Sequence, residues 1–277
     1  MVNLKYPSSI ALFVVWGLAS AIEIAPSKAN SIQPLSNAEP ERLQFVSPSS
    51  SSADDFEEEG RPTQRTAGGD RNACVEQLIA LIPGKGEIQN QPEACGGESV
   101  SFPTLTVVES PTFWFYVPAQ SAAGPTAEFV LLDDQEQPIL IQPVALSELP
   151  GVVSVSPPHP LEIGKSYRWL FSVLVNPDRP SRNPAVEGIV RRIEPNPTLL
   201  SQIESTVSPR DHVAIYARHG IWQDALTTLG NLRRTTPGDP SLLTDWTELL
   251  GSVGLGSLAS VPVVDCCQPG DGMVSYQ

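Results

Sequence analysis

Histidine and cysteine are scarce in this 277-residue sequence, which has three histidines and four cysteines. His159, His212 and His219 stand outside any H-E-x-x-H pattern and lack a cysteine at zinc-finger spacing. The C-x-x-C motif, the G-x-S-x-G nucleophile elbow and the G-x-x-x-x-G-K phosphate loop are also missing. We therefore expect no metal, no cofactor and no catalytic residue of the common kinds, and we interpret His212 and His219 as partly solvated helix residues.

Basic residues are also few, since 17 Lys and Arg stand against 31 Asp and Glu, which gives a formal net charge of -14. An acidic surface of this size repels phosphate backbones and anionic headgroups, so nucleic acid and membrane surfaces are poor partners. The pairs Arg191-Arg192 and Arg233-Arg234 are too few to change this, and we expect them on solvated faces.

The N-terminus has the pattern of a cleavable signal peptide. Lys5 precedes the apolar run Ile10 to Ala21, which is shorter than the about 20 residues that a membrane-spanning helix needs. Cleavage after Ser27-Lys28-Ala29 would make residues 1–29 the signal peptide, and a buried N-terminal helix is the alternative. We expect a periplasmic or extracellular protein with no stable membrane insertion after cleavage.

Residues 30–70 are rich in Ser, Pro, Glu and Asp and lack apolar periodicity, so we expect a disordered linker. Export favours disulfides, and we predict one between Cys74 and Cys95, which bracket a helix-like apolar run from Val75 to Ile82. Cys266 and Cys267 are badly placed to bond each other, so free thiols and cross-links between chains are the alternatives. Residues 263–277 are expected to form a flexible tail.

Residues 71–195 have the pattern of a β-sandwich domain. The predicted strands are Thr104–Glu109, Thr112–Val117, Ala127–Leu132, Ile139–Ile141, Val152–Val155, Tyr167–Val175 and Ala185–Ile193. Short strands without intervening helices favour an antiparallel, immunoglobulin-like sandwich, in which Trp169 lies on an apolar strand face. Leu161, Gly164 and Tyr167 match a tyrosine corner, with Gly164 in the turn and Leu161 beneath the ring.

Residues 196–262 have helical punctuation, which makes the fold class α+β. Asn196-Pro197, Ser208-Pro209 and Asp239-Pro240 each pair a capping residue with a proline at the first helical position. The stretch from Ser208 to Arg234 has small Gly220 and Ala225 and large Trp222 at the positions of a single tetratricopeptide-like hairpin.

Several strings together resemble a known family. They are PTFWFYVP from Pro111, LPGVVSVSPP from Leu149, GKSYRWLFSVL from Gly164, YARHGIWQDALTTLGNLR from Tyr216 and WTELLGSVGL from Trp246. In this order they resemble the cyanobacterial domain-of-unknown-function family 928 over about residues 60–265. The resemblance implies this architecture and an uncharacterised exported protein, and it adds no catalytic residue.

The remaining features favour protein binding over catalysis. We expect a non-catalytic interaction module whose partner is another periplasmic or envelope protein, and the oligomeric state stays open. The contact surface is predicted on a polar stripe of the hairpin, which includes Arg218, Gln223, Asp224 and Thr227.

Two alternatives stay open. Trp114 and Tyr116 share one side of their strand and would bind glycans if that side is exposed, although burial is the favoured interpretation. A hydrolase with two distant carboxylates is the other alternative, but Asp133-Asp134 is expected in a hairpin turn.

The signal-peptide prediction can be tested directly. N-terminal sequencing of the protein purified from the periplasmic fraction should give a chain that starts near Asn30. Recovery of a soluble cytoplasmic product that retains Met1 would contradict the prediction.

Overall fold

The computed structural model describes residues 42–47, 77–84, 101–119, 125–176, 179–267 and 274–275. Arg42–Gln277 forms one compact unit, and Met1–Glu41 is a second unit that contains no described residue. The predicted signal peptide and the predicted bond between Cys74 and Cys95 lie outside the described residues. Within these ranges, no helix is long and apolar enough to cross a membrane.

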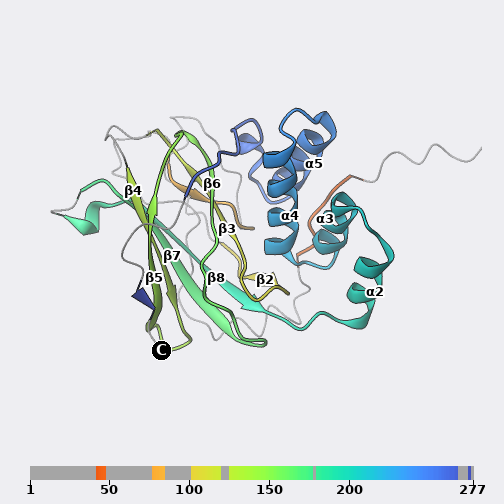
Figure 1. Ribbon diagram of the computed structural model, residues 1–277, viewed down its shortest axis with the longest axis horizontal. Coiled ribbons are helices and arrows are strands. Elements are labelled where there is room, and N and C mark those ends of the chain that lie inside the picture. Colours follow the sequence, from red (N-terminus) through yellow and green to blue (C-terminus); the bar gives the residue numbers. More distant parts are fainter. Residues whose placement is uncertain are drawn as a thin grey trace, which may run out of the picture. The chain divides into compact units, whose positions relative to one another are not determined.

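The described strands form two sheets (Figure 1). The smaller has the order β1–β3–β6, made of β1 (Ile79–Ala80), β3 (Phe113–Val117) and β6 (Gly151–Val155). The larger has the order β2–β8–β7–β4–β5–β9, made of β2 (Thr104–Thr106), β8 (Ala185–Arg192), β7 (Ser166–Leu174), β4 (Thr126–Leu132), β5 (Pro138–Ala145) and β9 (Val274–Ser275). Neighbours are antiparallel except β2 and β8. The predicted α+β class with mostly antiparallel strands is confirmed.

Strand β1 corrects one prediction, because the apolar run Val75–Ile82 was expected to be helix-like. Ile79 instead pairs with Tyr116 of β3, and the Leu81 amide donates to the Trp114 carbonyl at 2.9 Å. Residues 78–82 are buried on both sides of the strand, so the run has no polar face. Periodicity cannot separate a strand from a helix in a continuous apolar run.

In the described residues four α-helices follow β8, and three of them begin where the cap signals predict a helix. They are α2 (Pro197–Ser205), α3 (Pro209–Arg218), α4 (Trp222–Thr235) and α5 (Pro240–Gly251). The side chains of Asn196, Ser208 and Asp239 accept amide hydrogen bonds at the starts of α2, α3 and α5, and each precedes a proline. These caps satisfy amides that a helix start leaves unpaired.

Strand β3 is buried on both faces. Phe113 and Phe115 face the larger sheet, where the Phe115 ring stacks on Phe171 with centroids 4.0 Å apart. Trp114 faces the helices and meets Trp246 of α5 edge-on at 6.4 Å. Figure 1 shows α4 and α5 on one side of β3 and β6, and β4, β5 and β7 on the other. The smaller sheet therefore lies between the larger sheet and the helices, and β3 contacts both.

The turn before β7 has the contacts expected of a tyrosine corner. The Tyr167 hydroxyl accepts a hydrogen bond from the Glu162 amide at 3.1 Å, and Leu161 is buried. Gly164 has a φ of 83°, which glycine adopts without steric cost. Trp169, two residues after Tyr167, is buried against Phe113 and Phe115.

Helix α4 lies so close to β3 that one position admits only glycine. A Cβ atom on Gly230 would lie 2.5 Å from Cη2 of Trp114. Contacts this short force the indole or the helix to move, and overpacking of this kind costs about 1–3 kcal/mol. Gly230 therefore sets the distance between the helices and the smaller sheet.

We predict that Gly230→Ala destabilises the protein by about 1–3 kcal/mol, although alanine favours a helix by about 1 kcal/mol over glycine. Gly251→Ala is the matched control, because a Cβ there at the end of α5 meets nothing within 4 Å. Urea unfolding of both variants measures the difference. Equal midpoints for the two would contradict the packing argument.

Candidate interaction site on the helices

An extended segment before the first strand lies against the helices. Three successive contacts hold its backbone: the Leu43 amide donates to Oε2 of Glu248 at 2.8 Å, the Phe45 amide donates to Oγ of Ser252 at 3.2 Å, and the Val46 amide donates to the Ala217 carbonyl at 3.0 Å. We call residues 42–47 the docking segment. Ala217, Trp222, Glu248 and Ser252 form the helical docking face.

Alternate side chains of the docking segment point into the protein. Phe45 is 8% exposed and meets the Trp222 ring edge-on, with centroids 5.0 Å apart. Leu43 packs against the same core and is partly buried, whereas Gln44 and Val46 are exposed. Alternation of this kind is typical of an extended peptide bound through its backbone and every second side chain.

The docking segment contradicts the prediction of a linker that is disordered throughout residues 30–70. The polar composition outweighs the short apolar group Leu43, Phe45 and Val46 when the stretch is averaged. The alternation of Leu43 and Phe45 was the available signal. Glu248 and Ser252, which bind the segment, carry no pattern that distinguishes them from other polar helix residues.

A contact with the residue after β1 and an ion pair between two helices hold the docking face in place. The Trp222 indole donates to the Leu81 carbonyl at 2.8 Å, which fixes the ring over β1. Gly220, with a φ of 72°, ends α3 and lets Trp222 begin α4, while Ala225 is fully buried one turn later. Nη2 of Arg210 in α3 donates to Asp245 in α5 at 2.9 Å, so these two helices are tied together.

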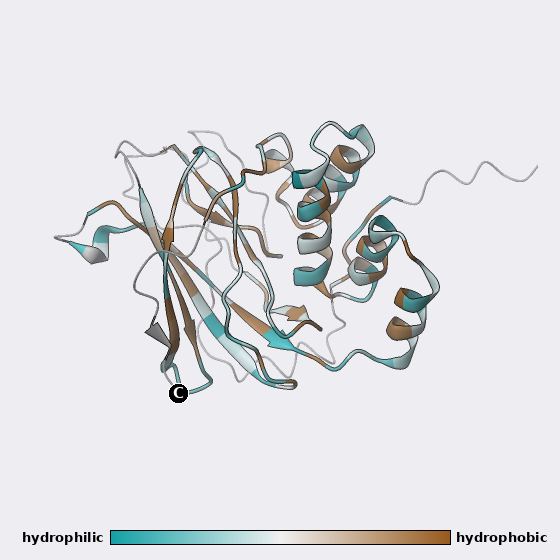
Figure 2. Cartoon of the chain, viewed as in Figure 1, coloured by the Kyte–Doolittle hydropathy of each residue, from teal (hydrophilic) through white to brown (hydrophobic). Residues whose placement is uncertain are grey.

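The predicted polar stripe does not form an exposed surface, and this prediction is wrong for three of its four residues. Arg218 is exposed, but Gln223 and Asp224 are 2% and 5% exposed and Thr227 is half-buried. The Gln223 amide donates to Thr104 at 3.3 Å, and Thr227 accepts from the Trp114 indole at 3.1 Å. Gln223, Asp224 and Thr227 face the sheets, because α4 contacts β2 and β3 on one side and α3 and α5 on the other. Figure 2 shows hydrophobic and hydrophilic residues on this helix.

Asp224 is the most perturbed acid of the described residues. Its Oδ2 accepts from the Thr106 hydroxyl at 2.7 Å and the Val107 amide at 3.3 Å, and its Oδ1 has no hydrogen-bond partner within the described ranges. Burial raises the pKa of this carboxyl from 3.8 to about 6, and the hydrogen bonds to Thr106 and Val107 lower it by less. Burial, helped by the Asp224 charge, also raises the pKa of Tyr216.

Two of the three histidines, His212 and His219, join α3 to α2. His212 Nε2 lies 3.2 Å from the Ile203 carbonyl and 3.0 Å from the Thr206 carbonyl, and His219 Nε2 lies 2.8 Å from Oε1 of Gln202. Both side chains are partly exposed. No group of three or more possible metal ligands occurs in the part of the chain that the structure describes.

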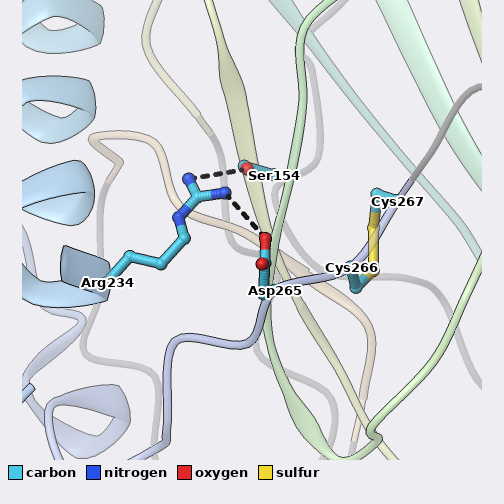
Figure 3. The surroundings of a disulfide bond; sticks show 5 residues. All are labelled: Ser154, Arg234, Asp265, Cys266 and Cys267. Atoms are coloured by element: carbon cyan, nitrogen blue, oxygen red, sulfur yellow. Dashed lines mark hydrogen bonds and ion pairs between the residues drawn. A yellow bond between two sulfur atoms is a disulfide. The ribbon is translucent and has the colours of Figure 1, made fainter.

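The Arg233-Arg234 pair was expected on a solvated face, but both side chains are partly buried. Arg233 lies over the Trp246 ring at 5.3 Å and Arg234 over the Trp114 ring at 5.2 Å. Nη2 of Arg234 also donates a hydrogen bond to Oγ of Ser154 at 3.2 Å, and Nη1 lies 3.8 Å from Oδ1 of Asp265 (Figure 3). Cation–π contact and desolvation of the long stems explain the packed positions.

Cys266 and Cys267, next to Asp265, correct another expectation, because they are bonded to each other (Figure 3). Their Cα atoms are 3.7 Å apart, and Cys267 has a φ of 79°. The left-handed backbone at Cys267 accompanies the bond between neighbours. Both residues pack against the core, so the start of the predicted flexible tail is held.

The two sheets and the helices that cover them define an α+β protein whose helices hold an extended segment. The sequence pattern of the family described as Domain of Unknown Function (DUF928) matches residues 62–263, well over half of the chain, and the protein belongs to this family. A comparison with curated proteins gives no match. The matched range covers the described strands and helices up to residue 263, and it begins after the docking segment.

The buried Asp224 carboxyl makes stability depend on pH. Because its folded pKa of about 6 exceeds 3.8, the folded state holds the proton more tightly than the unfolded state. Its contribution is therefore favourable at low pH and is lost as pH rises from about 4 through about 6. A shift of this size corresponds to about 3 kcal/mol.

We predict that Asp224→Asn removes this part of the pH profile. Urea unfolding between pH 4 and 7.5 should show that the difference in stability between variant and wild type shifts in favour of the variant as pH rises. Asp134→Asn, at an exposed turn position, is the control. Parallel pH profiles for wild type and Asp224→Asn would refute the assignment.

Proposed function

We propose that the protein is an exported, non-catalytic interaction module of the periplasm or extracellular space that binds another envelope protein through the helical docking face. The observation that carries the proposal is the docking segment, whose Leu43, Phe45 and Val46 amides are all bound by the helices. A face that holds one extended peptide in this way has the groups needed to hold another. The signal-peptide pattern of residues 1–29 supports the proposed location.

We further propose that the two sheets form an immunoglobulin-like sandwich. The order β8–β7–β4–β5 corresponds to strands G, F, C and C′ of such a sandwich, and the order β1–β3–β6 corresponds to A, B and E. Tyr167 then stands at the start of strand F, where immunoglobulin-like folds place the corner tyrosine. Gly220 and Ala225, buried between α3 and α4, support a tetratricopeptide-like hairpin.

The alternatives find less support. Trp114 and Tyr116 are 2% and 3% exposed, as the favoured interpretation expected, so they offer no open glycan-binding face. Oδ1 of Asp133 accepts from the amides of Gln135 and Gln137 in the β4–β5 turn, which is a structural use of this carboxylate.

The proposal predicts that a charge reversal on the docking face abolishes partner capture. Tagged wild type, Glu248→Arg and Leu174→Arg would be used to capture proteins from envelope extract, with quantification by mass spectrometry. Glu248→Arg removes the acceptor of a peptide amide and should lose the partner. Leu174→Arg, at an exposed end of β7, should keep it. Both variants should be checked by urea unfolding, and retention of every captured protein by folded Glu248→Arg would overturn the proposal.

A further inference from the structure

The described contacts of the docking segment use its backbone and two apolar side chains. Three hydrogen bonds to the helices use its backbone amides, and its inward-facing side chains are the partly buried Leu43 and the buried Phe45 two positions later. The intervening Gln44 and the flanking Arg42 are exposed. Another extended peptide with the pattern aliphatic–x–aromatic has the groups needed to make the same contacts.

The docking segment is joined to the rest of the unit by a long stretch of sequence. The roughly 30 residues between Ser47 and the next described residue, Gln77, reach about 100 Å when fully extended. Because the docking segment and the docking face belong to one chain, the segment competes with a free peptide at an effective concentration on the order of millimolar.

We infer that the docking segment is an internal competitor that occupies the helical docking face until a partner peptide with the aliphatic–x–aromatic pattern displaces it. This inference rests on the proposed function and adds both the chemistry of the partner and its regulation. At a millimolar effective concentration, a segment whose dissociation constant is on the order of 10–100 μM weakens a competing peptide about 10- to 100-fold.

The arrangement of the contacts identifies Phe45 as the residue to change. Its ring is buried against Trp222, so Phe45→Ala weakens the segment and leaves Ala217, Glu248 and Ser252 in place. Val46→Ala is the matched control, because the Val46 side chain is 52% exposed and its backbone contact is retained. Leu43→Ala, at a partly buried position, is a second variant with a smaller perturbation.

The test uses a fluorescent peptide with the sequence of residues 40–49, titrated by fluorescence anisotropy into the full mature chain. Phe45→Ala should bind the peptide about 10- to 100-fold more tightly than wild type, Leu43→Ala several-fold more tightly, and Val46→Ala like wild type. The same peptide with alanine in place of its phenylalanine should not bind. Unfolding curves establish whether each variant is folded. If Phe45→Ala is unfolded, the affinity of Leu43→Ala is compared with that of wild type instead.

The outcomes separate the two proposals. Equal affinity of wild type and a folded Phe45→Ala chain would overturn the internal competition and leave the peptide-binding function standing. No binding by any folded variant would overturn both. Size-exclusion chromatography at tens of micromolar adds a third arm: a wild-type dimer that Phe45→Ala dissociates would mean that the segment binds a second copy, which contradicts an internal competitor.

Discussion

Trp114 of β3 is enclosed by α4 and α5, and this contact joins the sheets to the helices. Its indole donates to Thr227, its ring leaves no room for a Cβ at Gly230, and Arg234 covers it at 5.2 Å. Because Phe113 and Phe115 on the other face pack into the larger sheet, one strand anchors both halves of the protein. The helices are thereby held in the orientation that presents Ala217, Glu248 and Ser252 together.

The sequence was most informative where local chemistry decides the structure. Proline after a capping side chain marks the starts of α2, α3 and α5 because the cap and the proline act within one turn. The alternation of apolar and polar residues predicts β7, because one face of this strand is buried and the other is not. The apolar run at β1 gave no such contrast, so its strand follows only from the pairing with β3.

The candidate site depends on contacts between distant residues, and the sequence predicts little of it. Gln223 and Asp224 are polar, which favours exposure, but β2 offers Thr104 and Thr106 as buried partners that a single sequence does not reveal. A single sequence does not reveal the partners of the docking segment either, since the acceptor for the Leu43 amide lies 205 residues away. Phe45 gives a local hint through its spacing from Leu43, whereas Ser252 gives none.

The separation between the docking segment and its acceptors also sets an order for folding. During synthesis from the N-terminus, Leu43 and Phe45 emerge long before Glu248 and Ser252, which lie 205 and 207 residues later. Closing so long a loop costs entropy, and the two acceptors at α5 that help to offset it exist only once α5 has been made. The full set of docking contacts therefore forms only in a chain that has been made through its final helix. A chain that stops before α5 lacks the acceptors of the Leu43 and Phe45 amides, and incompletely packed apolar segments of this kind make unfinished chains prone to aggregation.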